Sequence, residues 1–68
     1  MEIGGRLKEL RKERKETQIQ VAKAVGMGER HYQRVEAGEG LPGLEIFCAL
    51  ADHFGVTLDY LAGRSETR

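Results

Sequence analysis

Residues 17–38 read TQIQVAKAVGMGERHYQRVEAG, and the caps and glycines of this stretch predict two short helices. Thr17 is a good N-cap, because its hydroxyl can accept a hydrogen bond from a backbone N–H group of the first turn. Gln20 follows three residues later, which is the spacing of a capping box. Gly26 and Gly38 stand where helical periodicity stops, and glycine adopts the left-handed conformation of a helix end without steric penalty. We therefore expect a tight turn between the two helices.

The predicted helices, residues 18–25 and 29–37, each have one apolar side. The inward stripe of the first consists of Val21, Ala22 and Val25, and that of the second of Tyr32 and Val35. The outward side chains of the second are long and polar: Glu29, Arg30, His31, Gln33 and Arg34. Two such helices around a glycine-bearing turn form a helix-turn-helix, whose second helix enters the major groove of DNA. The alternative interpretation is an ordinary helical hairpin with a solvated polar face.

The length of 68 residues allows one small domain, residues 1–68. No apolar run approaches the roughly 20 residues that span a bilayer, and the N-terminus lacks the apolar core of a signal peptide, so we expect no membrane contact. The single cysteine, Cys48, cannot form an internal disulfide, which favours a reducing cytoplasm. Its apolar neighbours favour a buried, unreactive thiol.

Charge is distributed unevenly along the chain, although the formal net charge is zero. Residues 1–34 hold nine Lys/Arg and five Asp/Glu, a net of +4, whereas residues 35–68 hold two and six, a net of −4. Contacts to phosphate need a locally basic surface and not a basic total, so the asymmetry fits nucleic acid at the basic end. Chance asymmetry in a short chain is the alternative explanation.

The remaining sequence also has helical periodicity. Apolar residues predict a first amphipathic helix over residues 3–15, and an apolar stripe that includes Leu44 predicts a fourth over residues 44–54. A short fifth helix is predicted at 58–62, and the last residues, 64–68, are expected to be frayed. Nothing indicates a strand, so the predicted fold is all-α with five helices.

Enzymatic function is not supported by the sequence. His31 and His53 are far apart, with no cysteine or carboxylate at metal-ligand spacing, and we expect both on helix surfaces. The glycines stand at helix ends and not in a phosphate-binding loop. We therefore expect no catalysis, metal or cofactor, and no small-molecule ligand in so small a core.

Residues from about 6 to 61 resemble the lambda-repressor-like helix-turn-helix family, also called the Cro or xenobiotic-response-element type. The matching pattern is Arg6-x4-Arg11, Thr17-Gln18-x2-Val21-Ala22-x3-Gly26, Tyr32-x2-Val35-Glu36-x-Gly38, Pro42, Leu44 and Leu50-Ala51-x2-Phe54-Gly55-Val56-Thr57-Leu58-Asp59-Tyr60-Leu61. The resemblance implies a compact five-helix domain whose second and third helices read double-stranded DNA.

The resemblance also implies roles for individual residues. Gln18 matches a glutamine that grips a backbone phosphate, which suits the N-terminus of a helix. We expect His31 and Arg6 to contact phosphates as well. The positions that touch base edges are Glu29, Arg30, Gln33 and Arg34, with arginine suited to guanine, glutamine to adenine and glutamate to cytosine. Arg11 and Glu36 match a partly buried salt bridge between the first and third helices.

Some residues depart from the family pattern. Glu16 stands where an apolar residue is usual, and Gly28 is a weaker N-cap than the common serine or threonine. Glu29 places a negative charge near phosphates, which implies either a cytosine preference or weak DNA affinity. Tyr32 replaces a smaller aliphatic residue, so we expect a rearranged core around the third helix.

The predicted function is a sequence-specific DNA-binding transcriptional regulator, a short phage or mobile-element repressor acting in the bacterial cytoplasm on the nucleoid. We expect a homodimer on a near-palindromic operator, since one short helix reads few base pairs. The candidate dimer surface consists of Leu41, Leu58, Tyr60 and Leu61, although Leu58 and Leu61 also suit the monomer core. The alternatives are an antitoxin, a restriction-modification controller protein, or a protein-interaction module that uses the same fold.

Overall fold

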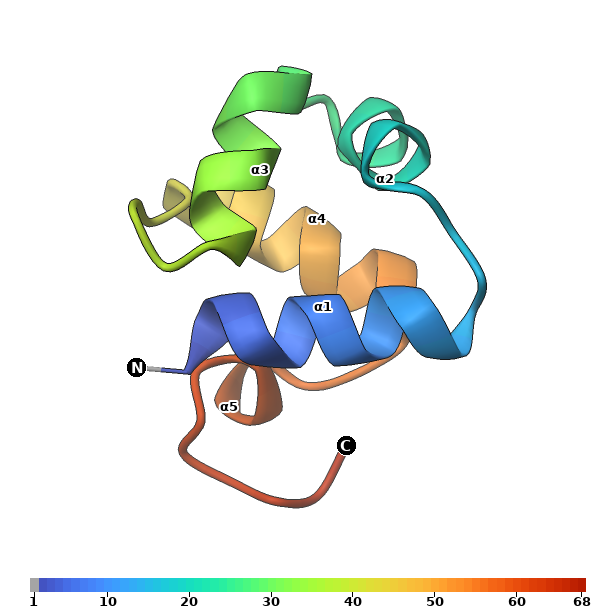
Figure 1. Ribbon diagram of the computed structural model, residues 1–68. Helices are drawn as coiled ribbons and strands as arrows, with labels where there is room; N and C mark the ends of the chain where they lie inside the picture. The colour runs from blue at the N-terminus through green and yellow to red at the C-terminus, as the bar shows by residue number, and fades with distance from the viewer. Residues whose placement is uncertain (1) are drawn as a thin grey trace.

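The computed structural model describes residues 2–68, and Met1 of the predicted domain lies outside the described residues. The described chain forms α1 (Ile3–Glu13), α2 (Gln18–Val25), α3 (Glu29–Glu36), α4 (Leu44–Phe54) and α5 (Leu58–Leu61). It contains no strand, so the predicted all-α class is confirmed. Figure 1 shows α1 crossing the middle of the molecule, with α2 and α3 on one side, α5 on the other, and α4 behind.

All five helices contribute side chains to one core. Its largest fully buried side chains are Leu7, Val21, Tyr32, Val35, Leu50 and Leu61. Met27, in the turn between α2 and α3, is buried as well, and its amide donates a hydrogen bond of 2.8 Å to the Ala22 carbonyl. The burial of Met27 was not predicted, because helical periodicity says nothing about a residue inside a turn.

The first helix is shorter than predicted, since it ends at Glu13 and not at residue 15. Arg14 is its C-cap, and Lys15 adopts a left-handed conformation with a φ of 56°. After Leu10 the helix has no further apolar side chain to bury, so packing does not hold another turn. The third and fifth helices also end one residue before their predicted ends, at residues 36 and 61.

The closest approach between α1 and α3 occurs at Gly4, a buried glycine inside α1. A Cβ atom built on Gly4 would lie 2.5 Å from the Glu36 carbonyl oxygen and 2.6 Å from that of Val35. The first turn of α1 therefore packs directly on the backbone at the C-terminal end of α3. This contact holds α1 close enough for its next turns to reach the side chains of α3.

The C-terminal segment, residues 62–68, runs in the same direction as α1 (Figure 1) and is bonded to it at two points, so the prediction of a frayed end was wrong. Arg6 donates to the Ser65 carbonyl at 3.0 Å and pairs with Glu66 at 2.7 Å. Arg68 pairs with Glu13 at 2.6 Å, on the same side of α1. These partners lie more than 50 residues apart in the sequence, so no local pattern indicated the contacts.

The link between α1 and α2 is tied to the end of α4. His53 Nε2 lies 3.0 Å from both carboxylate oxygens of Glu16, and Arg14 donates to the His53 carbonyl at 2.6 Å. We had predicted His53 on the outer surface of α4. It lies instead in the contact between α4 and the link from α1 to α2. The pair also explains why Glu16 is accepted at a position that is usually apolar.

Candidate nucleic-acid interface

The N-terminus of α2 has the predicted capping box. Thr17 Oγ1 accepts from the Gln20 amide at 3.1 Å, and Gln20 Oε1 accepts from the Thr17 amide at 2.8 Å. Gln18 is therefore the first residue of a well-defined helix, beside backbone N–H groups that favour an anion.

The turn between α2 and α3 depends on Gly26, which ends α2 with a φ of 79°. Gly28 is the N-cap of α3 and has an extended backbone, with a φ of −68° and no side chain to accept from the helix. Glu29 in the first turn offsets this weak cap, because a negative charge is favourable near a helix N-terminus.

We expect Gly28→Ser to raise the free energy of unfolding by about 0.5–1 kcal/mol, since serine supplies a capping oxygen and restricts the unfolded chain. A Cβ atom at Gly28 would meet no atom within 4 Å. Gly26→Ser is the matched control: its Cβ would also be unobstructed, but the left-handed backbone disfavours it by about 1 kcal/mol. Thermal unfolding of both variants measures the effect, and a stabilised Gly26→Ser would contradict this account of the turn.

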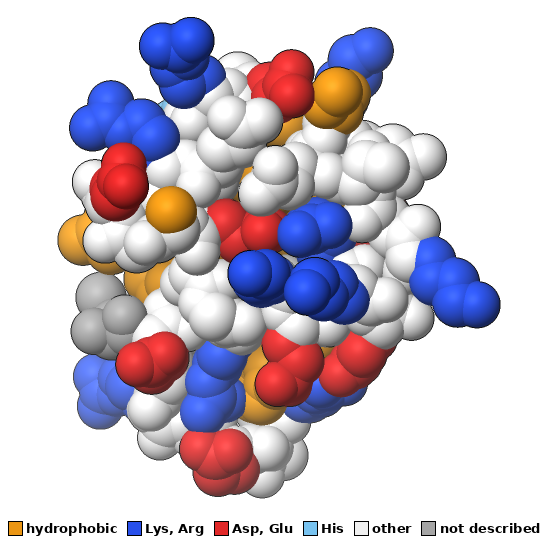
Figure 2. Space-filling model, viewed as in Figure 1, with side chains coloured by type: hydrophobic (Ala, Val, Ile, Leu, Met, Phe, Trp, Pro, Cys, Tyr) orange, Lys and Arg blue, Asp and Glu red, His pale blue; other side chains and the backbone are white. Residues whose placement is uncertain are grey.

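The outer face of α3 is polar and exposed along the whole helix, while Tyr32, Val35 and Glu36 are buried. The exposed side chains are those predicted from the sequence: Glu29, Arg30, His31, Gln33 and Arg34. Gln33 Nε2 donates to Glu29 Oε2 at 3.2 Å, so these two side chains support each other one turn apart. In Figure 2, lysine and arginine side chains project from the part of the surface that α2 and α3 form and cluster over α1, with acidic side chains interspersed among them.

A network of charged and polar side chains joins α1, α2 and α3 beneath this face. Arg11 donates from Nε to Glu36 Oε2 at 2.8 Å and from Nη2 to Glu36 Oε1 at 2.9 Å. Gln18 Nε2 donates to the same Oε1 at 3.0 Å. The side chain of Glu36 is only 3% exposed and that of Arg11 14%. The predicted salt bridge is thus present as a bidentate pair, and it has a third member that the sequence analysis did not connect to it.

The same network sets the protonation of Glu36. Burial by itself raises the pKa of this carboxyl, but interactions with Arg11, Tyr32 and Gln18, of which the hydrogen bond from Arg11 is the largest, outweigh burial and hold its pKa below the ordinary value. For Arg11, the hydrogen bonds that its guanidinium donates to Glu36 outweigh burial and raise the pKa of the guanidinium. Both groups are therefore charged at neutral pH.

We expect the stability of the fold to decrease in acid partly because of Glu36. A carboxyl whose pKa is lowered by folding stabilises the fold fully above its unfolded pKa of about 4.3, and this contribution is lost as the pH falls through the folded value. Urea unfolding between about pH 7 and pH 3 measures the free energy of unfolding of the wild type and of Arg11→Met/Glu36→Leu, which lacks both charges. The wild type should lose more stability in acid than this variant. If the two proteins lost the same stability in acid, Glu36 would not be a cause of that loss.

Arg6 does not join the residues of α2 and α3. Its guanidinium lies 4.4 Å from the centre of the Tyr60 ring and pairs with the C-terminal segment, on the side of α1 that faces α5. Arg11, by contrast, faces α3. Arg6 therefore lies apart from the polar residues of α2 and α3, and its phosphate contact stays a prediction.

The predicted dimer residues separate into two groups. Tyr60 and Leu61 are buried in the monomer, which removes them from the candidate surface, whereas Leu41 and Leu58 are exposed.

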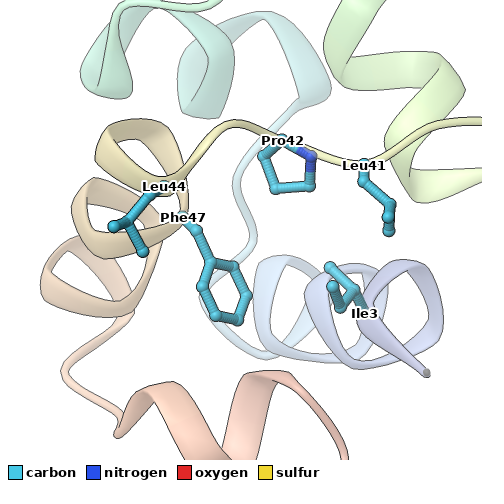
Figure 3. Close-up of a pocket in the computed structure, with 5 residues that line it drawn as sticks. All are labelled: Ile3, Leu41, Pro42, Leu44 and Phe47. Atoms are coloured by element: carbon cyan, nitrogen blue, oxygen red, sulfur yellow. The ribbon is translucent and has the colours of Figure 1, made fainter.

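Leu44 is 74% exposed, although it was predicted to belong to the inward stripe of α4. It lies at the first turn of α4, and with Leu41 it lines an open hollow of about 260 Å³ whose other walls are Ile3, Pro42 and Phe47 (Figure 3).

Residues 2–68 contain neither a membrane-spanning helix nor a metal site. No helix there has the length and apolar composition that a membrane crossing requires. No group of three His, Cys, Asp or Glu side chains is placed to hold a metal ion in that part of the chain.

Comparison with known proteins agrees with this arrangement. A helix-turn-helix family model matches residues 7–61. The cryptic phage CTXphi transcriptional repressor RstR of Vibrio cholerae serotype O1 is 39% identical over 67 residues, covering 98% of this chain and 60% of the relative. A second repressor of that name from Vibrio cholerae is 37% identical over 65 residues, covering 96% of this chain and 59% of the relative. The chain thus spans about 60% of the length of these relatives, and no solved structure gives a significant match.

The family match covers the capped α2, the glycine turn, the exposed face of α3 and the network beneath it. The resemblance stated from the sequence covers almost the same residues, from about 6 to 61. The chain therefore belongs to the lambda-repressor-like helix-turn-helix family of DNA-binding regulators and not to a family of enzymes.

Proposed function

We propose that the protein is a sequence-specific transcriptional repressor that inserts α3 into the major groove of an operator in the cytoplasm. The observation that carries the proposal is the exposed polar face of α3, held beside the capped N-terminus of α2. A helix in the major groove needs such a face, since its side chains must reach base edges without disturbing the core. The transcriptional repressors that share this sequence pattern support the assignment.

Within this interface, Arg30 and Gln33 are the proposed main base contacts, with Glu29 and Arg34 beside them. Arg30 suits the two acceptors of guanine, and Gln33 suits adenine. Glu29 is suited to accept from cytosine, which accounts for a negative charge in this position. Gln18 and His31 take phosphates, which position the protein but carry no sequence information; Gln18 does so from the N-terminus of α2.

We expect Arg30→Ala to weaken binding to the preferred duplex by about 10- to 100-fold, and to weaken binding to random duplex much less. Arg64→Ala is the matched control, because Arg64 is an exposed arginine just beyond the end of α5, and Figure 1 shows α5 on the other side of α1 from α3. Fluorescence anisotropy with both duplexes measures the four affinities. Equal losses on the two duplexes would mean that Arg30 only contacts the backbone.

The preferred duplex comes from selection out of a random DNA pool at about physiological salt. Enrichment of a near-palindrome, with half-sites roughly one helical turn apart, would support a dimeric regulator. Failure of the folded protein to enrich any sequence would contradict the proposed function.

We propose further that the active form is a homodimer joined through the exposed leucines, Leu41 and Leu58, with Leu44 beside Leu41. Two copies are needed because one short helix distinguishes few base pairs. Sedimentation of Leu41→Glu and Leu58→Glu variants tests the surface. Ile19→Glu is the control, since Ile19 is an exposed apolar residue of α2. A wild-type protein that stays monomeric at all concentrations would contradict the dimer.

A protein-interaction module is the second candidate function. Glu29 favours it, because this carboxylate stands on the helix that approaches DNA and already engages Gln33. The salt dependence of DNA binding distinguishes the two functions. A steep fall in affinity with rising salt indicates released counterions and supports the repressor, whereas weak, salt-insensitive binding supports the module.

A further inference from the structure

We infer that Glu36 is a positioning residue for DNA binding, which holds the amide of Gln18 in the orientation that donates to a phosphate. The inference rests on the proposed function, because it assigns a task to the network beneath the DNA-reading helices. It joins two features that were predicted separately, the Arg11–Glu36 salt bridge and the phosphate contact of Gln18.

The orientation of Gln18 follows from the chemistry of its two ends. Its amide nitrogen carries two N–H donors, and its carbonyl oxygen is an acceptor only. The nitrogen donates one hydrogen to Glu36 Oε1 at 3.0 Å. A carboxylate cannot donate to a carbonyl oxygen, so Glu36 selects one of the two flipped forms of the amide. The second N–H then remains available for an anion at the N-terminus of α2.

Glu36 can perform this task only because it is itself held in place. Both of its carboxylate oxygens accept from the guanidinium of Arg11, and its side chain is almost entirely shielded from water. Arg11 is fixed in turn by a hydrogen bond of 3.0 Å from Nη1 to the Glu16 carbonyl. Three helices thus fix the orientation of one amide before any DNA is bound.

Arg11 has a second effect on the same site. A buried carboxylate next to a phosphate contact would repel the phosphate, and the repulsion would be strong in a medium of low dielectric constant. The bidentate pair with Arg11 neutralises Glu36 and removes this repulsion. Glu36 can therefore orient Gln18 without opposing the ligand that Gln18 binds.

The first test compares DNA affinities in two backgrounds, the wild type and Arg11→Met/Glu36→Leu. The double variant replaces both charges with apolar residues, a change that buried ion pairs generally tolerate, and circular dichroism verifies its fold. The ligand is a random-sequence duplex at low salt, because phosphate contacts do not depend on sequence. In the wild type we expect Gln18→Ala to weaken binding by about 10-fold. In the double variant we expect Gln18→Ala to weaken it less than about twofold.

A purely structural role for the pair gives a different result. The Gln18→Ala loss would then be the same in both backgrounds, and the inference would be overturned. It would also be overturned if the double variant bound DNA more tightly than the wild type, since Glu36 would then compete with phosphate for Gln18.

A second test needs no DNA. In ¹⁵N-labelled wild-type protein the side-chain amide of Gln18 should show slowed hydrogen exchange relative to that of Gln20, whose exposed side chain joins the capping box through its oxygen. This protection should disappear in Arg11→Met/Glu36→Leu. An unprotected Gln18 amide in the wild type overturns the inference and leaves the proposed function standing. If the Gln18 amide is protected but Gln18→Ala leaves DNA affinity unchanged, the result contradicts the phosphate contact of Gln18 in the proposed function.

Discussion

Arg11→Met is expected to lower the free energy of unfolding by about 3–5 kcal/mol, because it leaves the buried carboxylate of Glu36 without its cation. A domain of this length has a total stability of only about 3–10 kcal/mol. The variant should therefore be partly or wholly unfolded at 25 °C. Chemical denaturation followed by circular dichroism measures the loss directly.

The double variant Arg11→Met/Glu36→Leu separates a stranded charge from a general loss of packing. Replacing both partners of a buried pair with apolar residues removes the uncompensated charge, so most of the lost stability should return. Gln18 loses its acceptor in this variant, but its side chain is half-buried and water can replace the bond. A double variant that is as unstable as Arg11→Met alone would show that the charge is not the cause.

Gly4→Ala is expected to lower the free energy of unfolding by about 1–3 kcal/mol, although alanine is normally the better helix former. Its Cβ would meet the carbonyl oxygens of Val35 and Glu36, and backbone atoms cannot rotate away as a flexible side chain can. α1 must therefore move away from α3. This movement should also lengthen the contacts between Arg11 and Glu36, so DNA affinity should fall together with stability.

Gly5→Ala is the matched control, one residue further along the same helix. A Cβ atom there lies 3.3 Å from the end of the flexible Glu2 side chain, which can move aside. Gly5→Ala should therefore raise the free energy of unfolding by about 0.5–1 kcal/mol through helix propensity alone. Urea unfolding of the two variants should give shifts of opposite sign. Two shifts of the same sign would mean that the α1–α3 contact does not constrain Gly4.

The helix-turn-helix was predictable because its determinants act within one or two helical turns. The bonds between Thr17 and Gln20 join residues three apart, and the left-handed Gly26 ends α2 without help from any other helix. The exposed face of α3 follows from helical periodicity. Because Tyr32 and Val35 point inward, the side chains between and beside them point outward. Caps, glycines and apolar spacing are therefore sufficient for this part of the molecule.

The wrong predictions concern residues whose surroundings are set by another element. Leu44 fits the apolar period of α4, but no other helix covers the first turn of α4 at that point. Tyr60 was predicted at a dimer surface, but Arg6 and Arg68 cover its ring. The C-terminal residues, predicted to be frayed, are instead held by Arg6, about 60 positions away in the sequence.

The candidate interface combines both kinds of information. Its residues on α2 and α3 follow from local sequence, because helix type, helix ends and the outward face depend on neighbours within a few residues. The orientation of Gln18, the burial of Glu36 and the close packing at Gly4 come from the way in which α1 crosses α3. The two residues of such a contact are separated in the sequence by 18 positions in one case and by more than 30 in another. No repeating pattern in the sequence encodes separations of this size.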